Sequence, residues 1–532
     1  MTFPYSRKEA LNSIENGQWD MLIIGGGITG AGILREAVRR GLKALLIDQK
    51  DFAWGTSSRS TKMVHGGLRY LKEGNLALTR ESVKEREKLV KELPGLVESA
   101  VFVMPFYKGH LFGRLLMRLG LIVYDLLSGK EGKGRRHVCS VREMKTRAPL
   151  VDQSNLKGGF LIHDAVTDDA RLVLRVLSEA VKQGGTAINY LRGESLIKTD
   201  DQVTGLMARD DVSGREYTLQ AKVVVNATGA WADELRGQVS KKNTDHIRPL
   251  RGSHLIIPAD RLPLKDNVSL LHPKDGRPVL ALKWEDRILM GTTDIDHGHQ
   301  LDHEAAISPE ETDYLLEALN YQFPDAGLSR KDVISTMAGI RPVIDTGKKD
   351  PSDESRDHVI WEEDGMLSVT GGKLTTFRII ALDVMKATQL RLGHLSELNG
   401  DHPVFETQAT SQTPSLLSGN PEGSQRLLGR YGSFAESLVS ESPPETLKPV
   451  SGLSTLWAEL SWAASHEMVV HLDDLLLRRT RIGILLPRGA KDQLPEIRKI
   501  CQQALSWDDQ KWEAEEKRYL EIWESFYAVP EL

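Results

Sequence analysis

The sequence predicts an α/β fold, and three local patterns lead to that class. An apolar strand at 21–24 runs directly into a glycine-rich loop at 25–30, and a helical pattern follows at once. A second apolar strand occupies 43–47. A third, at 221–226, is largely apolar, as is typical of a strand buried on both faces of a parallel sheet. Strand, glycine loop, helix and strand in this order indicate a βαβ unit.

The glycine loop has the spacing of a phosphate-binding turn. Gly25 permits the tight turn, Gly27 lets the backbone approach a pyrophosphate, and Gly30 allows close packing of helix and strand. Asp48 closes the second strand about 20 residues after the glycines, where an acidic residue binds a ribose hydroxyl. The sequence therefore predicts a dinucleotide whose pyrophosphate lies at the positive end of the helix.

The composition indicates a globular enzyme with more than one domain. The chain has 532 residues, of which 40% are hydrophobic and 27% charged, and its formal net charge is -5. We expect no nucleic acid as a partner, because neutralising phosphates needs a surplus of Lys and Arg. Two distant cysteines, Cys139 and Cys501, exclude a disulfide framework and favour a reducing cytoplasm. No apolar run is long enough to span a membrane.

The patterns divide the chain into three parts. Residues 1–401 are expected to form the dinucleotide-binding region, interleaved with a β-rich substrate domain at roughly 72–160 and 243–340. Residues 402–423, rich in Thr, Ser, Gln, Pro and Gly, are expected to be a linker. Residues 424–532 are expected to form a C-terminal helical domain.

Periodicity predicts several further elements. Residues 74–127 are expected to be mainly helical, and 168–183 to be an amphipathic helix. Strand patterns separated by Gly, Pro and Asp at 245–300 favour an antiparallel sheet. The segment 371–373, Gly-Gly-Lys, is expected to open another helix.

A loop rich in hydroxyl groups follows the second strand, and together with other motifs it carries a family resemblance. The motifs are GGGITGAG at 25–32, GTSSRSTKMVHGGLRYL at 55–71, DDARL at 168–172, NATGAWAD at 226–233, RGSHL at 251–255, MGTTDID at 290–296, GIRP at 339–342, SRDH at 355–358 and GGKLTTFR at 371–378. In this order they make the chain resemble the FAD-dependent, respiratory glycerol-3-phosphate dehydrogenases. The resemblance implies FAD as cofactor and oxidation of sn-glycerol 3-phosphate to dihydroxyacetone phosphate by hydride transfer to FAD.

The resemblance also implies a set of FAD-binding residues, most of which offer backbone N–H groups or hydroxyls. They are Gly25, Gly27, Gly30, Asp48, Thr56, Ser57, Ser58, His65, Gly66, Gly67, Thr228, Gly229, Trp231, Gly372, Lys373, Leu374 and Thr375. The helix expected after 371–373 would turn its positive end toward the charge on a reduced flavin.

A phosphorylated substrate needs several cations in one pocket, and Arg suits phosphate because its planar fork donates two parallel hydrogen bonds. The resemblance implies a substrate site of Arg69, Tyr70, His254, Arg341, Arg356 and Lys373. Among these His254, Arg341 and Lys373 are the expected catalytic residues. His254 has an ordinary pKa of about 6.5, suited to taking the C2 hydroxyl proton, whereas Arg341 would stabilise an alkoxide. A purely structural His254 is left open.

The electron acceptor is left open between a quinone and oxygen, because dehydrogenases and oxidases share these motifs. Residues 109–136 combine apolar side chains with Arg and Lys. Such a segment is typical either of a helix lying on an anionic membrane surface or of a core helix followed by a basic loop. We expect a cytoplasmic protein, located peripherally on the inner face of the cell membrane in the first case. Formation of a homodimer is left open.

Three other readings are less favoured. The arginine set argues against an amine or amino-acid oxidase on the same fold, because amine substrates lack a phosphate dianion. Retention of the arginines and His254 argues against a flavin-binding subunit without turnover. Acidic and histidine residues gather at 294–303, but Asp and Gly favour a polar turn there, so no metal is expected.

Overall fold

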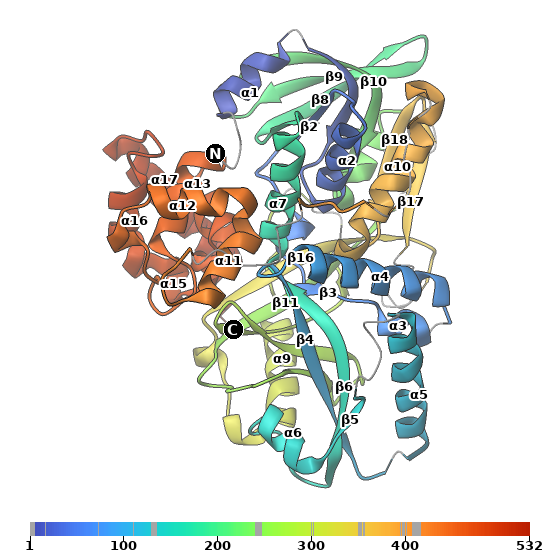
Figure 1. Ribbon diagram of the computed structural model, residues 1–532, viewed down its shortest axis with the longest axis vertical. Coiled ribbons are helices and arrows are strands. Elements are labelled where there is room, and N and C mark those ends of the chain that lie inside the picture. The colour runs from blue at the N-terminus through green and yellow to red at the C-terminus, as the bar shows by residue number, and fades with distance from the viewer. Residues whose placement is uncertain are drawn as a thin grey trace.

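Two sheets and a group of C-terminal helices make up the protein (Figure 1). The computed structural model describes residues 6–531 apart from 16, 73, 110, 129–135, 240–246, 299–300, 302, 349–353, 355–356, 394, 396–399, 401 and 407–415. One sheet lies above the other in Figure 1, and the C-terminal helices flank both on one side. The predicted α/β class is confirmed.

The first sheet is the predicted parallel sheet. Its strands are β1 (Gln18–Ile24), β2 (Ala44–Ile47), β7 (Thr186–Ile188), β8 (Leu191–Thr199), β9 (Gln202–Asp210), β10 (Glu216–Asn226), β17 (His358–Glu363) and β18 (Met366–Gly371). Their order is β17-β18-β10-β1-β2-β7, with β9 and then β8 attached to β10. Strands β18, β10, β1, β2 and β7 run parallel, so their carboxyl ends meet along one edge.

Three helices are packed together beside this sheet: α2 (Ile28–Arg39), α7 (Asp169–Lys182) and α10 (Phe377–Leu392). Helix α2 contacts both of the others. Gly32 makes the contact with α10 possible, since a Cβ there would lie 2.8 Å from the ring of Phe377. Helix α7 confirms the amphipathic helix predicted at 168–183, and the Asp168 side chain caps it by accepting from the N–H of Arg171.

The second sheet is mostly antiparallel, as predicted for 245–300. Its strands are β3 (Met63–Val64), β4 (Val97–Tyr107), β5 (Val138–Cys139), β6 (Leu156–Thr167), β11 (Ile247–Pro258), β12 (Asn267–Leu271), β13 (Pro278–Trp284), β14 (Arg287–Gly291), β15 (Ile295–Asp296) and β16 (Ser335–Ile344). Around it lie α3 (Leu68–Lys72), α4 (Leu76–Glu92), α5 (Leu111–Leu127), α6 (Val141–Arg147) and α9 (Pro309–Gln322).

The expectation that 74–127 is mainly helical is wrong in its middle part. Strand β4 separates α4 from α5 and pairs along its length with β6. Paired residues of the two strands are 49 to 70 positions apart in the chain, so local periodicity gives no sign of the pairing.

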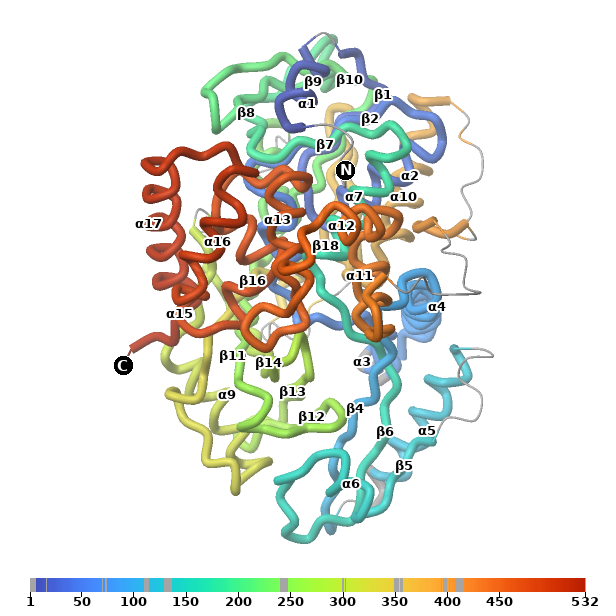
Figure 2. The backbone as a smooth tube through the Cα atoms, turned by 60° about the vertical axis from the view of Figure 1, so that its left-hand side comes forward, coloured from blue at the N-terminus to red at the C-terminus, as the bar shows by residue number. Residues whose placement is uncertain are grey.

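The C-terminal part is helical, as predicted. Its elements are α11 (Pro421–Tyr431), α12 (Ala435–Glu441), α13 (Trp457–His466), the π-helix η9 (Asp474–Arg479), α14 (Ile482–Leu485), α15 (Pro487–Ala490), α16 (Leu494–Cys501) and α17 (Asp509–Phe526). Figure 2 shows these helices as one layer against the rest of the molecule. They share an apolar core with the second sheet, in which Trp512 and Tyr519 lie with Ile256 and Met337. Helix α1 (Arg7–Ile14) precedes the first sheet. No helix in the described ranges is long and apolar enough to cross a membrane.

Candidate functional site

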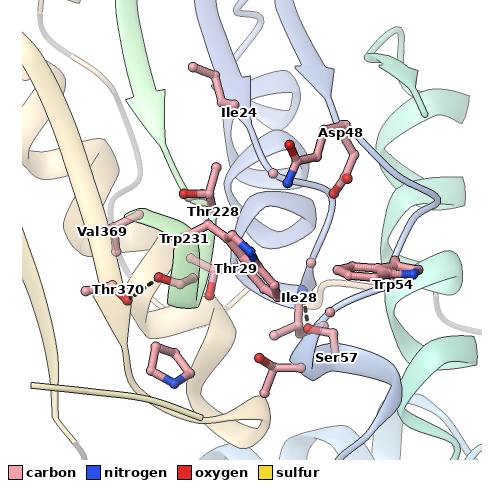
Figure 3. A pocket seen from close by; sticks show the side chains of 18 of the residues that line it. Ile24, Ile28, Thr29, Asp48, Trp54, Ser57, Thr228, Trp231, Val369 and Thr370 are labelled. Atoms are coloured by element: carbon pink, nitrogen blue, oxygen red, sulfur yellow. Dashed lines mark hydrogen bonds between the residues drawn. The ribbon is translucent and has the colours of Figure 1, made fainter. Parts of the chain in front are cut away.

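A cleft of about 520 Å³ opens where β1, β2 and β10 end (Figure 3). Open α/β sheets bind ligands at this edge, outside the carboxyl ends of the strands. Many of the residues expected to bind a cofactor line the cleft: Gly25, Gly27, Asp48, Thr56, Ser57, Thr228, Gly229, Trp231, Gly372, Lys373 and Leu374.

The glycine loop has the shape that a pyrophosphate site requires. Gly25 has a φ of +114°, and a Cβ there would lie 2.5 Å from the carbonyl oxygen of Ala227. A Cβ at Gly30 would lie 1.9 Å from the carbonyl oxygen of Gly25, so this turn packs against its own helix. The N-cap residue of α2 is Gly27, which has no side chain to cap the helix, and only the N–H of Ile28 is bonded to a side chain of the loop, that of Ser57. The helix therefore keeps backbone donors and its positive end for an anionic ligand.

Asp48 lies at the end of β2 and also lines the cleft. Its carboxylate accepts hydrogen bonds from the backbone N–H groups of Gly26 at 2.6 Å and Lys50 at 2.8 Å. Burial raises the pKa of Asp48 to about 7, against the effect of these two hydrogen bonds. The carboxyl group is thus held beside the glycine loop, as expected for a group that binds ribose.

The hydroxyl-rich loop turns two of its three predicted side chains to the cleft. Thr56 and Ser57 line it, and the Ser57 hydroxyl accepts a hydrogen bond of 3.0 Å from the N–H of Ile28, the first residue of α2. Ser58 is buried and does not line the cleft; its hydroxyl lies 3.5 Å from the carbonyl oxygen of Trp54. Ser58 thus lies on the side of the loop that faces the protein interior.

Four other predicted residues, His65, Gly66, Gly67 and Thr375, are not among those that line the cleft. The Thr375 hydroxyl accepts from the backbone N–H of His65 at 3.1 Å, which ties the 65–67 loop to the 3₁₀ turn η6 (Leu374–Thr376). The N–H of Gly66 donates to Asp164 at 3.0 Å. A Cβ at Gly66 would lie 2.5 Å from the Tyr124 hydroxyl, so this position requires glycine. Gly67 follows with a φ of +77°.

Lys373 lines the cleft and lies next to Tyr70. Its Nζ donates to the Ser82 hydroxyl at 2.7 Å and lies 4.0 Å from the centre of the Tyr70 ring. Burial lowers the pKa of Lys373 to about 8, although nearby carboxylates oppose the shift. The predicted Arg356 and the side chain of Arg69 lie outside the described residues.

The guanidinium of Arg341 is held by Asp294 and Thr292 beside the cleft. The next residue in the chain, Pro342, lines the cleft. One guanidinium nitrogen lies 2.8 Å from Asp294 and the other donates to the Thr292 hydroxyl at 3.0 Å. A Cβ at Gly252 on the neighbouring strand would lie 2.3 Å from this guanidinium. Glycine there makes room for the arginine.

Asp294 forms the ion pair with Arg341. It also pairs with Arg277 at 3.1 Å, so one carboxylate holds two guanidinium groups. Asp296 of the same acidic and histidine segment pairs with Arg248 at 2.6 Å, and His299 lies outside the described residues.

His254 is brought close to the loop but not into the cleft lining. Its side chain is 1% exposed, and its Nε2 lies 3.0 Å from the Thr61 hydroxyl. A Cβ at Gly291 would lie 2.2 Å from the imidazole, so the ring packs on a bare backbone. Burial, followed by the positive charges of Arg341 and Lys62, lowers the pKa of His254 well below its ordinary value. The imidazole is therefore neutral at neutral pH.

Several lining residues were not predicted. Trp54 faces Trp231 with ring centres 5.7 Å apart, and its position between the second strand and the hydroxyl loop was an available signal. Arg192 and Glu194 also line the cleft, from β8. They belong to no motif, and only the pairing of the sheet brings them to this place.

Comparison with known proteins agrees with this geometry. Residues 20–378 match the family described as FAD dependent oxidoreductase, and residues 397–512 match the C-terminal domain of alpha-glycerophosphate oxidase. The chain is 34% identical over 501 residues to an aerobic glycerol-3-phosphate dehydrogenase of Staphylococcus haemolyticus, covering 89% of both chains. A Staphylococcus aureus protein of the same name is 34% identical over 502 residues, which cover 90% of this chain and 89% of that one.

Solved structures show the same arrangement. A glycerol-3-phosphate dehydrogenase of Bacillus halodurans complexed with FAD superposes with a TM-score of 0.79 at 28% identity, covering 98% of each chain. An L-alpha-glycerophosphate oxidase of Mycoplasma pneumoniae with FAD bound gives a TM-score of 0.54 at 18% identity, covering 73% of this chain and 98% of that one. The second likeness is one of fold.

Proposed function

The chain belongs to the family of FAD-dependent glycerol-3-phosphate dehydrogenases, and from this premise we propose that it oxidises sn-glycerol 3-phosphate to dihydroxyacetone phosphate and passes the electrons to a quinone. The predicted FAD cofactor is confirmed. The observation that carries the substrate class is a pair of cations, Lys373 in the cleft lining and the Arg341 fork next to the lining residue Pro342.

The residues of the cleft fit FAD. Gly25 and Gly27 leave room for a diphosphate at the N-terminus of α2, and Asp48 provides a carboxyl group for ribose. When bound, FAD supplies the acceptor for the hydride that leaves C2 of the substrate. The chain itself must bind the phosphate, orient C2 and take up the hydroxyl proton.

Two groups of the chain suit these tasks. Arg341 has a guanidinium fixed by Asp294 and only partly buried, so it suits a phosphate or a developing alkoxide. His254 is neutral at neutral pH, so a ring nitrogen is free of a proton and can accept one, and its lowered pKa makes it a weaker base than an ordinary histidine. The imidazole Nε2 lies 3.0 Å from the hydroxyl of Thr61, and the residue before Thr61 in the chain, Ser60, lines the cleft.

The central experiment mixes the FAD-loaded protein anaerobically with sn-glycerol 3-phosphate and follows the flavin absorbance. We expect bleaching with the phosphorylated substrate and little with glycerol, because glycerol offers no dianion to the cations. Equal bleaching by glycerol would contradict the assignment of a phosphate pocket.

The affinity for the phosphorylated substrate is expected to fall as pH rises through about 8. The pKa of Lys373 is lowered to about 8, so its positive charge is present below that pH and is lost above it. A bound dianion favours the charged form of Lys373 and therefore extends the pH range in which the substrate binds well. Because only one proton is lost, KM can rise by at most about tenfold per pH unit. The measurement is KM between about pH 7 and pH 9.

Lys373→Arg is the control for this effect, because a guanidinium stays charged throughout the range. Its KM should change less with pH than that of the wild type. Identical profiles in the two proteins would show that another group causes the pH dependence.

Helix α5 supports the choice of a quinone, which is dissolved in the bilayer. Its exposed apolar side chains lie at helical spacing on one face: Leu115, Leu116, Leu119, Ile122, Val123 and Leu126. Arg118 adds a positive charge near this face. Figures 1 and 2 show α5 at the edge of the molecule, away from the C-terminal helices. We propose that this face lies on an anionic membrane surface.

Leu116→Asp is expected to weaken co-sedimentation with vesicles containing phosphatidylglycerol by about tenfold or more, since burying a leucine contributes about 1.5–3 kcal/mol. Leu390→Asp is the matched control, because Leu390 is 97% exposed and lies on α10 rather than α5. Binding of the wild type should also weaken with salt. Absence of binding even at low salt, together with rapid peroxide formation in air, would point to the oxidase alternative.

A further inference from the structure

Side chains of the C-terminal region bind the loop 51–59, which forms one wall of the cofactor cleft. The first anchor is Asp51, which is fully buried. Its two carboxylate oxygens accept from Arg479 at 2.6 and 2.7 Å, and one of them also accepts from Arg478 at 2.6 Å. Burial acts to raise the pKa of Asp51, but the two guanidinium groups outweigh it and keep that pKa below its ordinary value.

The second anchor is the backbone carbonyl of Ser58. It accepts from Arg481 at 2.8 Å and from Lys62 at 2.6 Å. Arg481 also binds Asp169 at 2.6 Å, and Lys62 binds the same carboxylate at 2.7 and 2.8 Å. A carbonyl held by two buried cations has one fixed orientation.

The third anchor is Arg59. It lies 3.1 Å from the hydroxyl of Tyr527, the residue that follows α17, and 2.9 Å from Glu304. Glu304 in turn accepts from the indole N–H of Trp54 at 3.0 Å. The end of the C-terminal region thus connects to a side chain of the cleft wall.

These anchors lie on both sides of the longest continuous stretch of the loop that lines the cleft. Residues 53–57 line the cleft, and the anchors are at Asp51 before them and at Ser58 and Arg59 after them. Ser57, within this stretch, bonds to the first N–H of α2. A loop held in its binding conformation before the ligand arrives avoids the cost of ordering it on binding.

Buried ion pairs contribute little net stability compared with apolar packing, and one attested use is to specify a single arrangement. We propose that Arg481, together with Arg478 and Arg479, positions the 51–59 loop for FAD, so that the C-terminal helices are a structural part of the cofactor site. These arginines are positioning residues and act through Asp51 and Ser58. The proposal depends on the cofactor and not on the substrate or the electron acceptor.

Arg481→Met tests this with little disturbance of the ion network. Asp169 keeps Lys62 as a partner, and Asp168 keeps Arg430. Arg430→Met is the matched control, because Arg430 is equally buried in the same region but binds Asp168 and Glu285, which are outside the loop. FAD-loaded proteins are dialysed against fixed FAD concentrations, and the flavin content gives Kd; the midpoint of thermal unfolding is measured alongside.

We expect R481M to raise the Kd for FAD by about tenfold, equivalent to about 1.4 kcal/mol, and R430M to raise it less than about twofold. The unfolding midpoints should fall by similar amounts, since both variants remove a buried charge. Arg481→Lys keeps the charge on a single donor nitrogen in place of the planar fork, and its Kd should lie between those of wild type and R481M. Equal Kd values for R481M and R430M would overturn the proposal. If R481M does not fold, R481K against R430M decides the question in the same way.

Discussion

Replacement of His254 by Asn is expected to slow reduction of the flavin by sn-glycerol 3-phosphate by about 10²–10⁴-fold, the usual contribution of a general base. The neutral imidazole is able to accept the C2 hydroxyl proton, and an amide is not. Substrate binding should change much less, because the role lies in the transition state. Stopped-flow absorbance under anaerobic conditions measures both effects from the dependence of the rate on substrate concentration.

His272→Asn is the matched control for burial. His272 is also 1% exposed, its Nε2 lies 3.0 Å from the carbonyl oxygen of Tyr314 on α9, and neither residue lines the cleft. This variant should reduce the flavin at nearly the wild-type rate. A loss of less than about threefold in H254N would make His254 structural, and Arg341 or Lys373 would then manage the alkoxide.

The second large effect is expected at Arg341. Arg341→Met should lower kcat/KM for sn-glycerol 3-phosphate by about 10–150-fold, because a hydrogen bond to a charged group contributes about 1.5–3 kcal/mol. The FAD content should stay unchanged, since Arg341 does not line the cofactor cleft. Asp294 keeps Arg277 as its partner, so no buried carboxylate loses all its charge neutralisation.

Arg277→Met separates the role of the ion pair from that of the fork. It removes the other guanidinium on Asp294 and leaves the bond between Arg341 and Asp294 in place. Its kcat/KM should remain within a few-fold of the wild type. If both variants lose the same activity, Arg341 acts only by maintaining the local fold and the phosphate is bound elsewhere.

The cofactor half of the site follows from local spacing. A turn that must pass close to another backbone accepts only glycine, as the short distances at Gly25 and Gly30 show. The glycines that meet this requirement lie within a few residues of each other, so the sequence alone reveals them. Asp48 is equally local, because it ends the strand that follows the same helix. For this reason the βαβ unit and the lining residues Gly25, Gly27 and Asp48 could be predicted from neighbouring residues.

The substrate half depended on motifs far apart in the chain. Arg341 and His254 lie on β16 and β11, and their neighbourhood exists only because those strands pair. The burial of His254, which sets its protonation state, comes from packing on Gly291 of a third strand, β14. The residue types identified Arg341 and His254 as candidates, but they did not reveal how exposed these side chains are or which groups they contact.

Long-range pairing explains what local patterns missed. Strand β4 could not be separated from the helices around it, because its partner β6 is remote in sequence. Arg481 gave no local signal for a role at the cofactor loop, although it lies within hydrogen-bonding distance of Ser58. Turns, caps and glycine positions depend on neighbouring residues and can be read from the chain, whereas burial, pKa shifts and ion pairs between distant segments arise only when the tertiary fold excludes water from them.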